Sequence, residues 1–480
     1  MRIFVNMNYT LFLTLLLVYV GVLVLVGQFT AGSGSNQTFF TANRNANWLL
    51  VSFGMIGASL SGVTFISVPG WTANSGWTYM LMVQGYLIGY AIIAFVLLPV
   101  YYRYKVISIY SYLGHKLGKQ SYQTGSAFFL LSRIIGASAR LYIVTMIVQI
   151  TICEAFNIPF LVTAMIVLAL IAVYSASGGI ATIVITDTLQ TTLMLAATGM
   201  ALYFVGREVL SEGQGLWSYI SSSDQFYFVE EGTARAWWKQ VLGGASIAVA
   251  MTGLDQDMMQ KNLTVRTLRG AQKNMILLGI TLIFVNALFL SLGVVLSDYA
   301  AMAGIAETGD KMFVAVATSS AMPPVLGAVF FLGLLAAAFS SADSALASLT
   351  TAFCVDFLRL DGKGSTKIRN QVYVAFMAVI LAVMFGIYQL QEETIISTLF
   401  TAAGYTYGPL LGLFALALTT NRTISHWGVL AIAIAAPLLS YGLSLWAPTL
   451  GYTIGFELLL YNGAITYVGA WLISQAPSRS

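Results

Sequence analysis

The sequence Ala336-Ala337-Ala338-Phe339-Ser340-Ser341-Ala342-Asp343-Ser344 lies inside an apolar segment that is long enough to cross a bilayer. Three hydroxyls and one carboxylate interrupt this segment. At helical i, i+3, i+4 and i+7 spacing, one face carries Ala337, Ser340, Ser341 and Ser344. Water does not reach the hydrocarbon core, so polar groups there need partners in the protein or on a bound ion. A charged side chain at mid-membrane costs about 2.5–3.5 kcal/mol, and it therefore indicates an ion or solute path.

The composition indicates a membrane protein with many spans. Hydrophobic residues make up 58% of the 480 residues and charged residues only 8%, whereas soluble domains contain about 25% charged residues. Apolar windows of about 20 residues predict about thirteen membrane helices in one domain, residues 1–480. The predicted helices span residues 8–27, 48–69, 76–102, 121–152, 158–175, 179–206, 237–258, 274–297, 323–353, 371–388, 393–419, 427–446 and 451–474. The net charge of +4 is spread over loops and does not form a patch for nucleic acid.

The distribution of charge predicts the orientation in the membrane. Lysines and arginines gather in one set of short loops, including the loops within 103–119, 261–273 and 359–369. Cytoplasmic loops carry such an excess, so we expect the N-terminus outside and the C-terminus in the cytoplasm. The expected location is the plasma membrane, as a multi-pass protein of the bacterial inner membrane. The apolar run from Tyr9 to Val26 is longer than the core of a usual signal peptide, so we interpret it as a retained first helix.

The sequence contains a weak internal echo. Gly57-Ala58-Ser59-Leu60 follows Trp48 in the second predicted span, and Gly244-Ala245-Ser246-Ile247 follows Trp237 in the seventh. Each begins a block of five helices, and the blocks have opposite orientation because five is odd. This is typical of an inverted repeat whose first helices are broken at mid-membrane around a binding site. Taken alone, the echo is better explained by the gathering of small residues where membrane helices pack.

The second predicted span contains a stretch that forms a poor membrane helix. Between Gly57 and Thr64 it has two glycines, two serines and a threonine. Glycine permits unwinding, and an unwound stretch exposes carbonyl oxygens that suit a hard cation and hydroxyls that suit a polar solute. A close helix–helix contact is the alternative interpretation.

Three passages resemble the sodium:solute symporter family, which includes sodium–glucose, sodium–proline and sodium–sialic acid symporters. They are Gly57 to Gly70, ending Phe65-Ile66-Ser67-Val68-Pro69-Gly70; Ser177 to Gln190, with Gly178-Gly179 and then Thr186-Asp187-Thr188-Leu189-Gln190; and the serine stripe of the ninth span. Smaller echoes are Asp255-Gln256 with Gln260 and Lys261, and Tyr407-Gly408-Pro409-Leu410. The resemblance covers residues 48–419, which is most of the chain.

The resemblance implies an all-α, leucine-transporter-type fold of two inverted five-helix repeats, here 48–206 and 237–419, with 8–27 and 427–474 peripheral. It implies a secondary active transporter that couples sodium entry to uptake of an amino acid, sugar acid or sugar by alternating access. The expected partners are this solute and the lipid bilayer, with no obligatory protein partner. We expect no enzyme activity, because the sequence shows no nucleophile–base set. Two alternatives stay open: a proton-coupled transporter that uses Asp187 and Asp343, and a membrane sensor that binds a solute without moving it.

The resemblance also assigns the main site for the coupling ion, Na⁺. It implies that the broken helix supplies the carbonyls of Gly57 and Leu60. The serine helix supplies the carbonyl of Ala337 and the hydroxyls of Ser340 and Ser341. Five uncharged oxygens suit a weakly held monovalent ion better than Ca²⁺, which prefers carboxylates. The alternative is that the serines only bond to carbonyls of their own helix.

A second cation site is implied less directly. In relatives with a second sodium, the residue that matches Asp187 joins hydroxyls of the serine helix, here Ser340 and Ser344. This sequence adds Asp343, where some relatives carry a neutral residue. Two close carboxylates do not both stay ionised without a cation. The pair could hold a second sodium, share a proton, or pair with an arginine of the fourth span.

The resemblance implies solute contacts from the broken helix and its neighbours. The expected residues are Ser59, Ser61, Thr64, Gln84 and Arg133. Arg133 and Arg140 lie seven residues apart on one face of the fourth span. The guanidinium of Arg133 suits a carboxylate, because its fork donates two parallel hydrogen bonds. Two alternatives stay open: a structural pair between one of these arginines and Asp187 or Asp343, or a side chain that extends to the inner face of the membrane.

Most of the aromatic residues need no function. They make up 13% of the chain, and belts of tryptophan and tyrosine are normal where a membrane protein meets the interface. Tyr405 and Tyr407 are the exception, because they lie beside Gly404 and Gly408. We expect these two tyrosines to form part of an outer gate.

Overall fold

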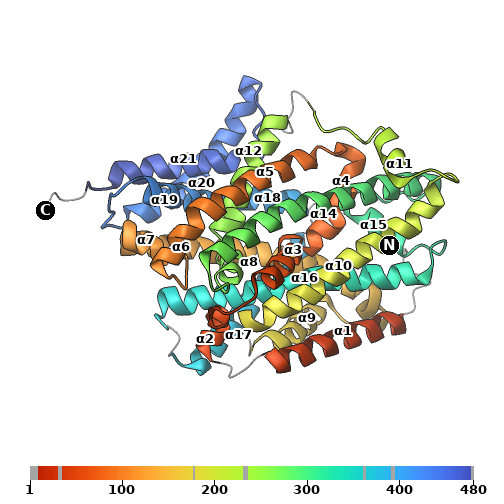
Figure 1. Ribbon diagram of the computed structural model, residues 1–480, viewed down its shortest axis with the longest axis horizontal. Coiled ribbons are helices and arrows are strands. Elements are labelled where there is room, and N and C mark those ends of the chain that lie inside the picture. Colours follow the sequence, from red (N-terminus) through yellow and green to blue (C-terminus); the bar gives the residue numbers. More distant parts are fainter. Residues whose placement is uncertain are drawn as a thin grey trace.

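Helices dominate the computed structural model of the chain (Figure 1). The structure describes residues 9–30, 35–176, 179–230, 236–360, 364–390 and 395–476. Residues 177–178 of one resembling passage, and the start of the predicted span 393–419, lie outside the described residues. The long helices α10, α14 and α16 cross the centre of Figure 1, with α1 at one edge and α20 and α21 at the opposite edge.

The bounds of the α-helices follow the predicted apolar windows closely for the long helices and less closely where a span is interrupted. In chain order they are α1 (Tyr9–Thr30), α2 (Asn36–Thr41), α3 (Trp48–Ser59), α4 (Gly62–Ser75), α5 (Tyr79–Ile92), α6 (Leu98–Tyr104), α7 (Ser111–Lys116), α8 (Lys119–Val148), α9 (Phe160–Ser175), α10 (Ile180–Val209), α11 (Leu216–Ser222), α12 (Trp237–Ala248), α13 (Gln256–Asn262), α14 (Leu268–Met302), α15 (Asp310–Ala317), α16 (Pro324–Ala352), α17 (Thr366–Leu390), α18 (Ile395–Thr406), α19 (Gly408–Thr419), α20 (Gly428–Trp446) and α21 (Leu458–Ile473). Short 3-10 or π turns continue several of them: η1 (Ala42–Arg44), η2 (Ile93–Leu97), η3 (Gln149–Cys153), η4 (Glu154–Phe156), η5 (Val249–Gly253), η6 (Phe353–Phe357) and η7 (Ala447–Leu450).

The number of membrane spans is lower than predicted when each helix is judged by length and apolarity. Within the described ranges, nine helices are long and apolar enough to cross a membrane, or ten if α3 and α4 form one bent span. The apolar helices α9 and α21 are shorter, and α12 gives way to a π turn after twelve residues. The predicted count of thirteen is therefore not confirmed.

Three predicted spans are interrupted. The axes of α3 and α4 differ by 56°, and between them Leu60 (φ −94°, ψ 85°) and Ser61 (φ −70°, ψ 169°) leave the helical conformation. This interruption falls within the stretch 57–64 that the sequence marks as a poor helix. Leu254 and Asp255 separate η5 from α13, and Tyr407 separates α18 from α19. The third interruption was not predicted, because the apolar window runs through it.

The helix α16 forms the centre of the core. Every residue from Gly333 to Ala352 is buried, and α16 contacts α10, α8, α4 and α3. Alanine, serine and glycine dominate this segment, and such small side chains let membrane helices approach closely. The serine stripe therefore faces protein on all sides and not lipid.

α5 and α12 approach each other closely. A Cβ atom added to Gly85 would lie 2.2 Å from the carbonyl oxygen of Val241, and one added to Gly244 would lie 2.1 Å from that of Met82. Gly57, the other glycine of the internal echo, lies against Thr191 of α10, whose hydroxyl oxygen would be 2.3 Å from an added Cβ. Both glycines of the echo thus serve close packing.

Replacing Gly85 with alanine should lower the free energy of unfolding by about 1–3 kcal/mol, the usual cost of overpacking. The obstructing atom belongs to a backbone and cannot rotate away. Gly199→Ala in α10 is the matched control, because no atom outside its own helix lies within 4 Å of the new methyl group. Thermal unfolding in detergent measures both variants. Equal stability of the two would contradict the close contact between α5 and α12.

Candidate functional site

The interruption between α3 and α4 lies against the serine helix. Gly62, the first residue of α4, faces Ala338 of α16, whose Cα atom would be 3.7 Å from an added Cβ. The neighbours Ala337, Ser340 and Ser341 are at most 2% exposed. The structure therefore brings together the two segments from which the sodium ligands were predicted.

The predicted sodium ligands on α16 already make hydrogen bonds. The Ser341 hydroxyl donates to the carbonyl oxygen of Ala337, 3.2 Å away within the same helix. The Ser340 hydroxyl instead donates to a carboxylate oxygen of Asp187 on α10, 2.5 Å away. Bonding within the helix, the alternative given above, thus describes Ser341 and not Ser340. Uncharged carbonyl and hydroxyl oxygens are of the chemical type that a weakly held monovalent cation accepts, and a cation bound by the Ser341 hydroxyl would replace its bond to Ala337.

Asp187 forms a buried ion pair. The ammonium of Lys261, on α13, lies 2.8 Å from the second carboxylate oxygen of Asp187, and both side chains are 1% exposed. The carboxylate next to the predicted sodium site is thus neutralised by a cation of the protein itself. Sequence reasoning noticed Lys261 only as part of a motif and did not assign it this partner.

Of the predicted second cation site, Asp187 and Ser340 are bonded to each other, whereas Asp343 and Ser344 also have partners outside the site. The Ser344 hydroxyl donates to the carbonyl of Ser340 at 2.8 Å and approaches Asp257 at 3.2 Å. Asp343 accepts a hydrogen bond of 2.8 Å from the hydroxyl of Tyr174 on α9. Among the residues that the structure describes, no group of three or more His, Cys, Asp or Glu side chains is placed to hold a metal ion.

Arg133 has an ion-pair partner that the sequence did not suggest. Its guanidinium donates to Asp257 on α13 and lies 3.9 Å from Asp255. Asp255 also accepts a hydrogen bond from the hydroxyl of Tyr407. The pairs considered from the sequence, with Asp187 or Asp343, are not formed. α13 thus contributes Asp257 to Arg133 and Lys261 to Asp187, four residues apart on one helix.

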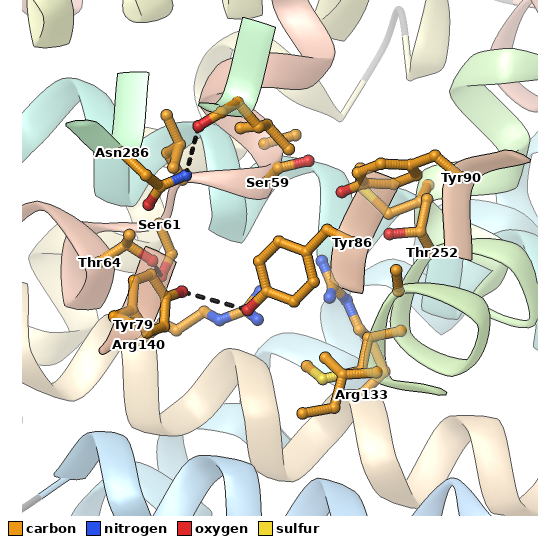
Figure 2. A pocket seen from close by; sticks show the side chains of 17 residues that line it. Ser59, Ser61, Thr64, Tyr79, Tyr86, Tyr90, Arg133, Arg140, Thr252 and Asn286 are labelled. Atoms are coloured by element: carbon orange, nitrogen blue, oxygen red, sulfur yellow. Dashed lines mark hydrogen bonds between the residues drawn. The ribbon is translucent and has the colours of Figure 1, made fainter. Parts of the chain in front are cut away.

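A cavity of about 100 Å³ opens beside the interruption (Figure 2). Its walls come from the α3–α4 interruption, α5, α8, the end of α12, η5, α13 and α14. The lining residues are Ala58, Ser59, Leu60, Ser61, Thr64, Tyr79, Tyr86, Tyr90, Arg133, Arg140, Ile247, Ala248, Met251, Thr252, Met258, Leu282 and Asn286. Sites for small organic ligands usually measure about 300–1,000 Å³, so the cavity has a contracted form here.

Four of the five predicted solute contacts line this cavity. They are Ser59, Ser61, Thr64 and Arg133. The fifth, Gln84, does not line the cavity, because its side chain is exposed elsewhere on α5. The cavity face of α5 carries Tyr79, Tyr86 and Tyr90 at i, i+7 and i+11 spacing, and residue 84 falls on another face of the helix. We therefore remove Gln84 from the candidate set.

Sequence reasoning missed the polar wall opposite the interruption. Figure 2 shows Tyr79 and Tyr86 directed toward each other, with hydroxyl oxygens 3.1 Å apart. Thr252 and Asn286 complete the wall from η5 and α14. The spacing of the three tyrosines on one face of α5 could have revealed this wall. The tyrosines were instead attributed to the aromatic belt of a membrane protein.

Tyr405 and Tyr407, the residues predicted to form part of an outer gate, reach different partners in this structure. The Tyr405 hydroxyl lies 3.3 Å from that of Ser444 on α20, whereas Tyr407 is buried and reaches Asp255. The interruption at Tyr407 turns successive side chains to different sides. The amide of Asn462, on α21, donates to the freed carbonyls of Gly404 at 3.0 Å and of Tyr405 at 2.8 Å.

Comparisons with known proteins agree with this arrangement. A model of the sodium:solute symporter family matches residues 39–435. A sodium/sialic acid symporter of Aliivibrio fischeri is 24% identical over 87% of this chain and 84% of its own length. Rabbit sodium/glucose cotransporter 1 is 23% identical over 87% of this chain and 70% of its own. A putative sodium-dependent multivitamin transporter of Drosophila melanogaster is 24% identical, but the match spans 55% of this chain and only 44% of that protein.

Solved structures show the same fold. The substrate-bound, outward-open structure of a Na⁺-coupled sialic acid symporter superposes with a TM-score of 0.80 at 17% identity, over 97% of this chain and 99% of the other. Mhp1, a nucleobase-cation-symport-1 family transporter in a closed conformation with bromovinylhydantoin bound, superposes with a TM-score of 0.57 at 14% identity, over 92% of this chain and 94% of the other. These likenesses confirm the predicted all-helical, leucine-transporter-type fold.

Proposed function

The chain belongs to the sodium:solute symporter family, and from this premise we propose how its buried residues carry out sodium-coupled symport of a small organic solute. Sodium binds the carbonyls of Gly57, Leu60 and Ala337 and the hydroxyls of Ser340 and Ser341. The solute binds in the adjacent cavity, and the protein then exposes both to the other side of the membrane. The observation that carries this proposal is the contact of the α3–α4 interruption with α16 at Ala338, next to the serine stripe, while the same interruption lines the cavity.

Leu60 offers a physical basis for coupling. Its carbonyl belongs to the proposed sodium site, and the same residue lines the cavity. Sodium and solute would therefore both fix the conformation of one interrupted segment, and two ligands that favour the same conformation bind cooperatively. Each sodium that moves inward through 100 mV contributes about 2.3 kcal/mol, in addition to its concentration gradient.

We propose one sodium ion per solute. A second sodium would need the carboxylate of Asp187, and the ammonium of Lys261 lies 2.8 Å from it. Asp343 and Ser344, the other members of the predicted second site, bond to Tyr174 and to Ser340 and Asp257. Lys261 would thus serve as a fixed cation in the place of a second ion.

The proposal also covers the orientation of the chain in the membrane, its location in the cell and its two repeats. The excess of lysine and arginine in one set of loops supports an outer N-terminus, a cytoplasmic C-terminus and uptake into the cell, with the bacterial inner membrane as the location. The repeats would comprise 48–206 and 237–419, each starting with an interrupted span, α3–α4 and α12–α13. We propose a transporter without enzyme activity and without an obligatory protein partner. An amino acid, a sugar acid or a sugar is the expected solute class, and sialic acid, which two of the similar symporters are named for, is the first to test.

Replacing external sodium by potassium at fixed pH should abolish uptake. The solute would first be found by thermal-shift screening of small metabolites with and without sodium, and uptake would then be measured in proteoliposomes. An imposed proton gradient should not restore uptake in potassium. Uptake driven by protons alone would instead support the transporter that uses Asp187 and Asp343. Sodium-dependent binding without accumulation would support a sensor.

A further inference from the structure

Arg140 is a guanidinium without a counter-ion inside the cavity. It makes no hydrogen bond or ion pair with any residue in the described part of the chain, and its Nε atom is buried without a partner. It also lines a second, smaller cavity, together with Arg133 and Tyr407. The Arg140 side chain is only partly buried, and its guanidinium lines the cavity without a counter-ion. An anion bound in the cavity would pair with this charge.

The lining of the main cavity is cationic. It contains two arginines and no aspartate or glutamate, and Figure 2 shows both guanidinium groups directed into the cavity. Arg133 is already neutralised, because Asp257 accepts its hydrogen bond. Asp255 and Asp257 lie beyond ion-pair distance from Arg140 and are occupied by Arg133 and Tyr407. The positive charge that faces the cavity unopposed is therefore that of Arg140.

A second buried group in the lining also lacks a partner. The amide nitrogen of Asn286 donates to the carbonyl of Leu282 at 2.7 Å, while its amide oxygen accepts no hydrogen bond from any described residue. Figure 2 places Asn286 across the cavity wall near Ser59 and Ser61. This oxygen can accept from a hydroxyl or amide N–H of a ligand, and leaving it unmatched costs free energy.

We propose that the solute is a small organic monocarboxylate without an ammonium group, and that Arg140, not Arg133, binds its carboxylate. The fork of Arg140 matches a carboxylate with two parallel hydrogen bonds, and Asn286 accepts from a hydroxyl or amide of the solute. A free ammonium finds no carboxylate in the lining, and the neighbouring sodium would repel it. This inference rests on the proposed function and narrows its solute class to sugar acids and similar hydroxylated acids.

The test uses pairs of ligands in which the same carboxyl group is either ionised or esterified and neutral. N-acetylneuraminate and glucuronate would each be compared with their methyl esters, and glucose and glutamine serve as the neutral and zwitterionic solutes. Binding to the full-length protein in detergent is measured with and without sodium. We expect at least one acid to bind in a sodium-dependent way, on the order of 30-fold more tightly than its ester, as loss of a charged hydrogen-bonded pair predicts.

Arg140→Gln should remove this preference, so that acid and ester bind equally, while sodium alone still stabilises the variant. Arg140→Lys keeps the positive charge but loses the paired N–H donors of the guanidinium. It should therefore keep only part of the preference for the acid over the ester. The inference is overturned if no acid of the panel binds, if glucose or glutamine binds as tightly as the acids, or if Arg140→Gln keeps the full preference. Binding of an acid without any dependence on sodium would instead contradict the proposed function and leave the assignment of Arg140 intact.

Discussion

Lys261→Met is expected to lower the free energy of unfolding by about 3–5 kcal/mol, the usual effect of removing one partner of a buried ion pair. The variant leaves the carboxylate of Asp187 buried without its ammonium, and the hydrogen bond from Ser340 alone does not balance the charge. The double variant Asp187→Asn with Lys261→Met should recover most of the loss, because it removes both charges. The free energies of unfolding of the wild type, the single variant and the double variant are measured in detergent by intrinsic fluorescence.

The same variant tests the proposed role of Lys261 as a fixed cation. If the ammonium stands in the place of a second ion, sodium should stabilise Lys261→Met more than it stabilises the wild type, because sodium can then approach Asp187. Lys311→Met is the control, since Lys311 is exposed at the start of α15. Equal stabilisation of variant and wild type by sodium, or equal stability of the single and double variants, would refute this role.

Joint replacement of Ser340 and Ser341 by alanine should raise the sodium concentration needed for half-maximal uptake by about 100-fold. Two of the five proposed ligands are lost, and each hydrogen bond or ion contact to a charged group contributes about 1.5–3 kcal/mol. Ser341→Ala alone is the cleaner variant, with an expected rise of about tenfold, because its hydroxyl bonds only to Ala337 and leaves no other side chain without a partner.

The control for this series lies on the same helix. The Ser348 hydroxyl bonds to the carbonyl of Ala345 at 3.0 Å and takes no part in the proposed site, so Ser348→Ala should leave the sodium requirement unchanged. Uptake by the double variant that is independent of sodium and as strong as in the wild type would exclude the proposed ligands.

The interruption in α3–α4 could be predicted because its cause is local. The glycines and serines between Gly57 and Thr64 lie within about two turns of helix. The interruption between α18 and α19 has a distant cause, since the freed carbonyls of Gly404 and Tyr405 are satisfied by Asn462 on α21. An apolar window cannot detect such a partner, because it lies more than fifty residues away.

In the candidate site, too, local features could be predicted from the sequence and distant contacts could not. The serine stripe and the two arginines were visible in helical spacing, but spacing does not tell which of several buried aspartates meets Arg133. That choice depends on where α13 turns after Leu254, which places Asp257 rather than Asp187 beside the guanidinium. The error at Gln84 was avoidable. In a helix, Tyr79 and Tyr86 lie on one face of α5, and residue 84 lies on another.

The contracted cavity has a thermodynamic consequence for every affinity measured on this protein. A ligand too large for the cavity as it stands can bind only to an expanded form. Its apparent dissociation constant is then the intrinsic one divided by the fraction of molecules in that form. An ion that raises this fraction strengthens ligand binding without touching the ligand, and the ligand must strengthen ion binding by the same factor. A weak dissociation constant in sodium-free buffer would thus report a scarce conformer rather than a poorly matched binding surface.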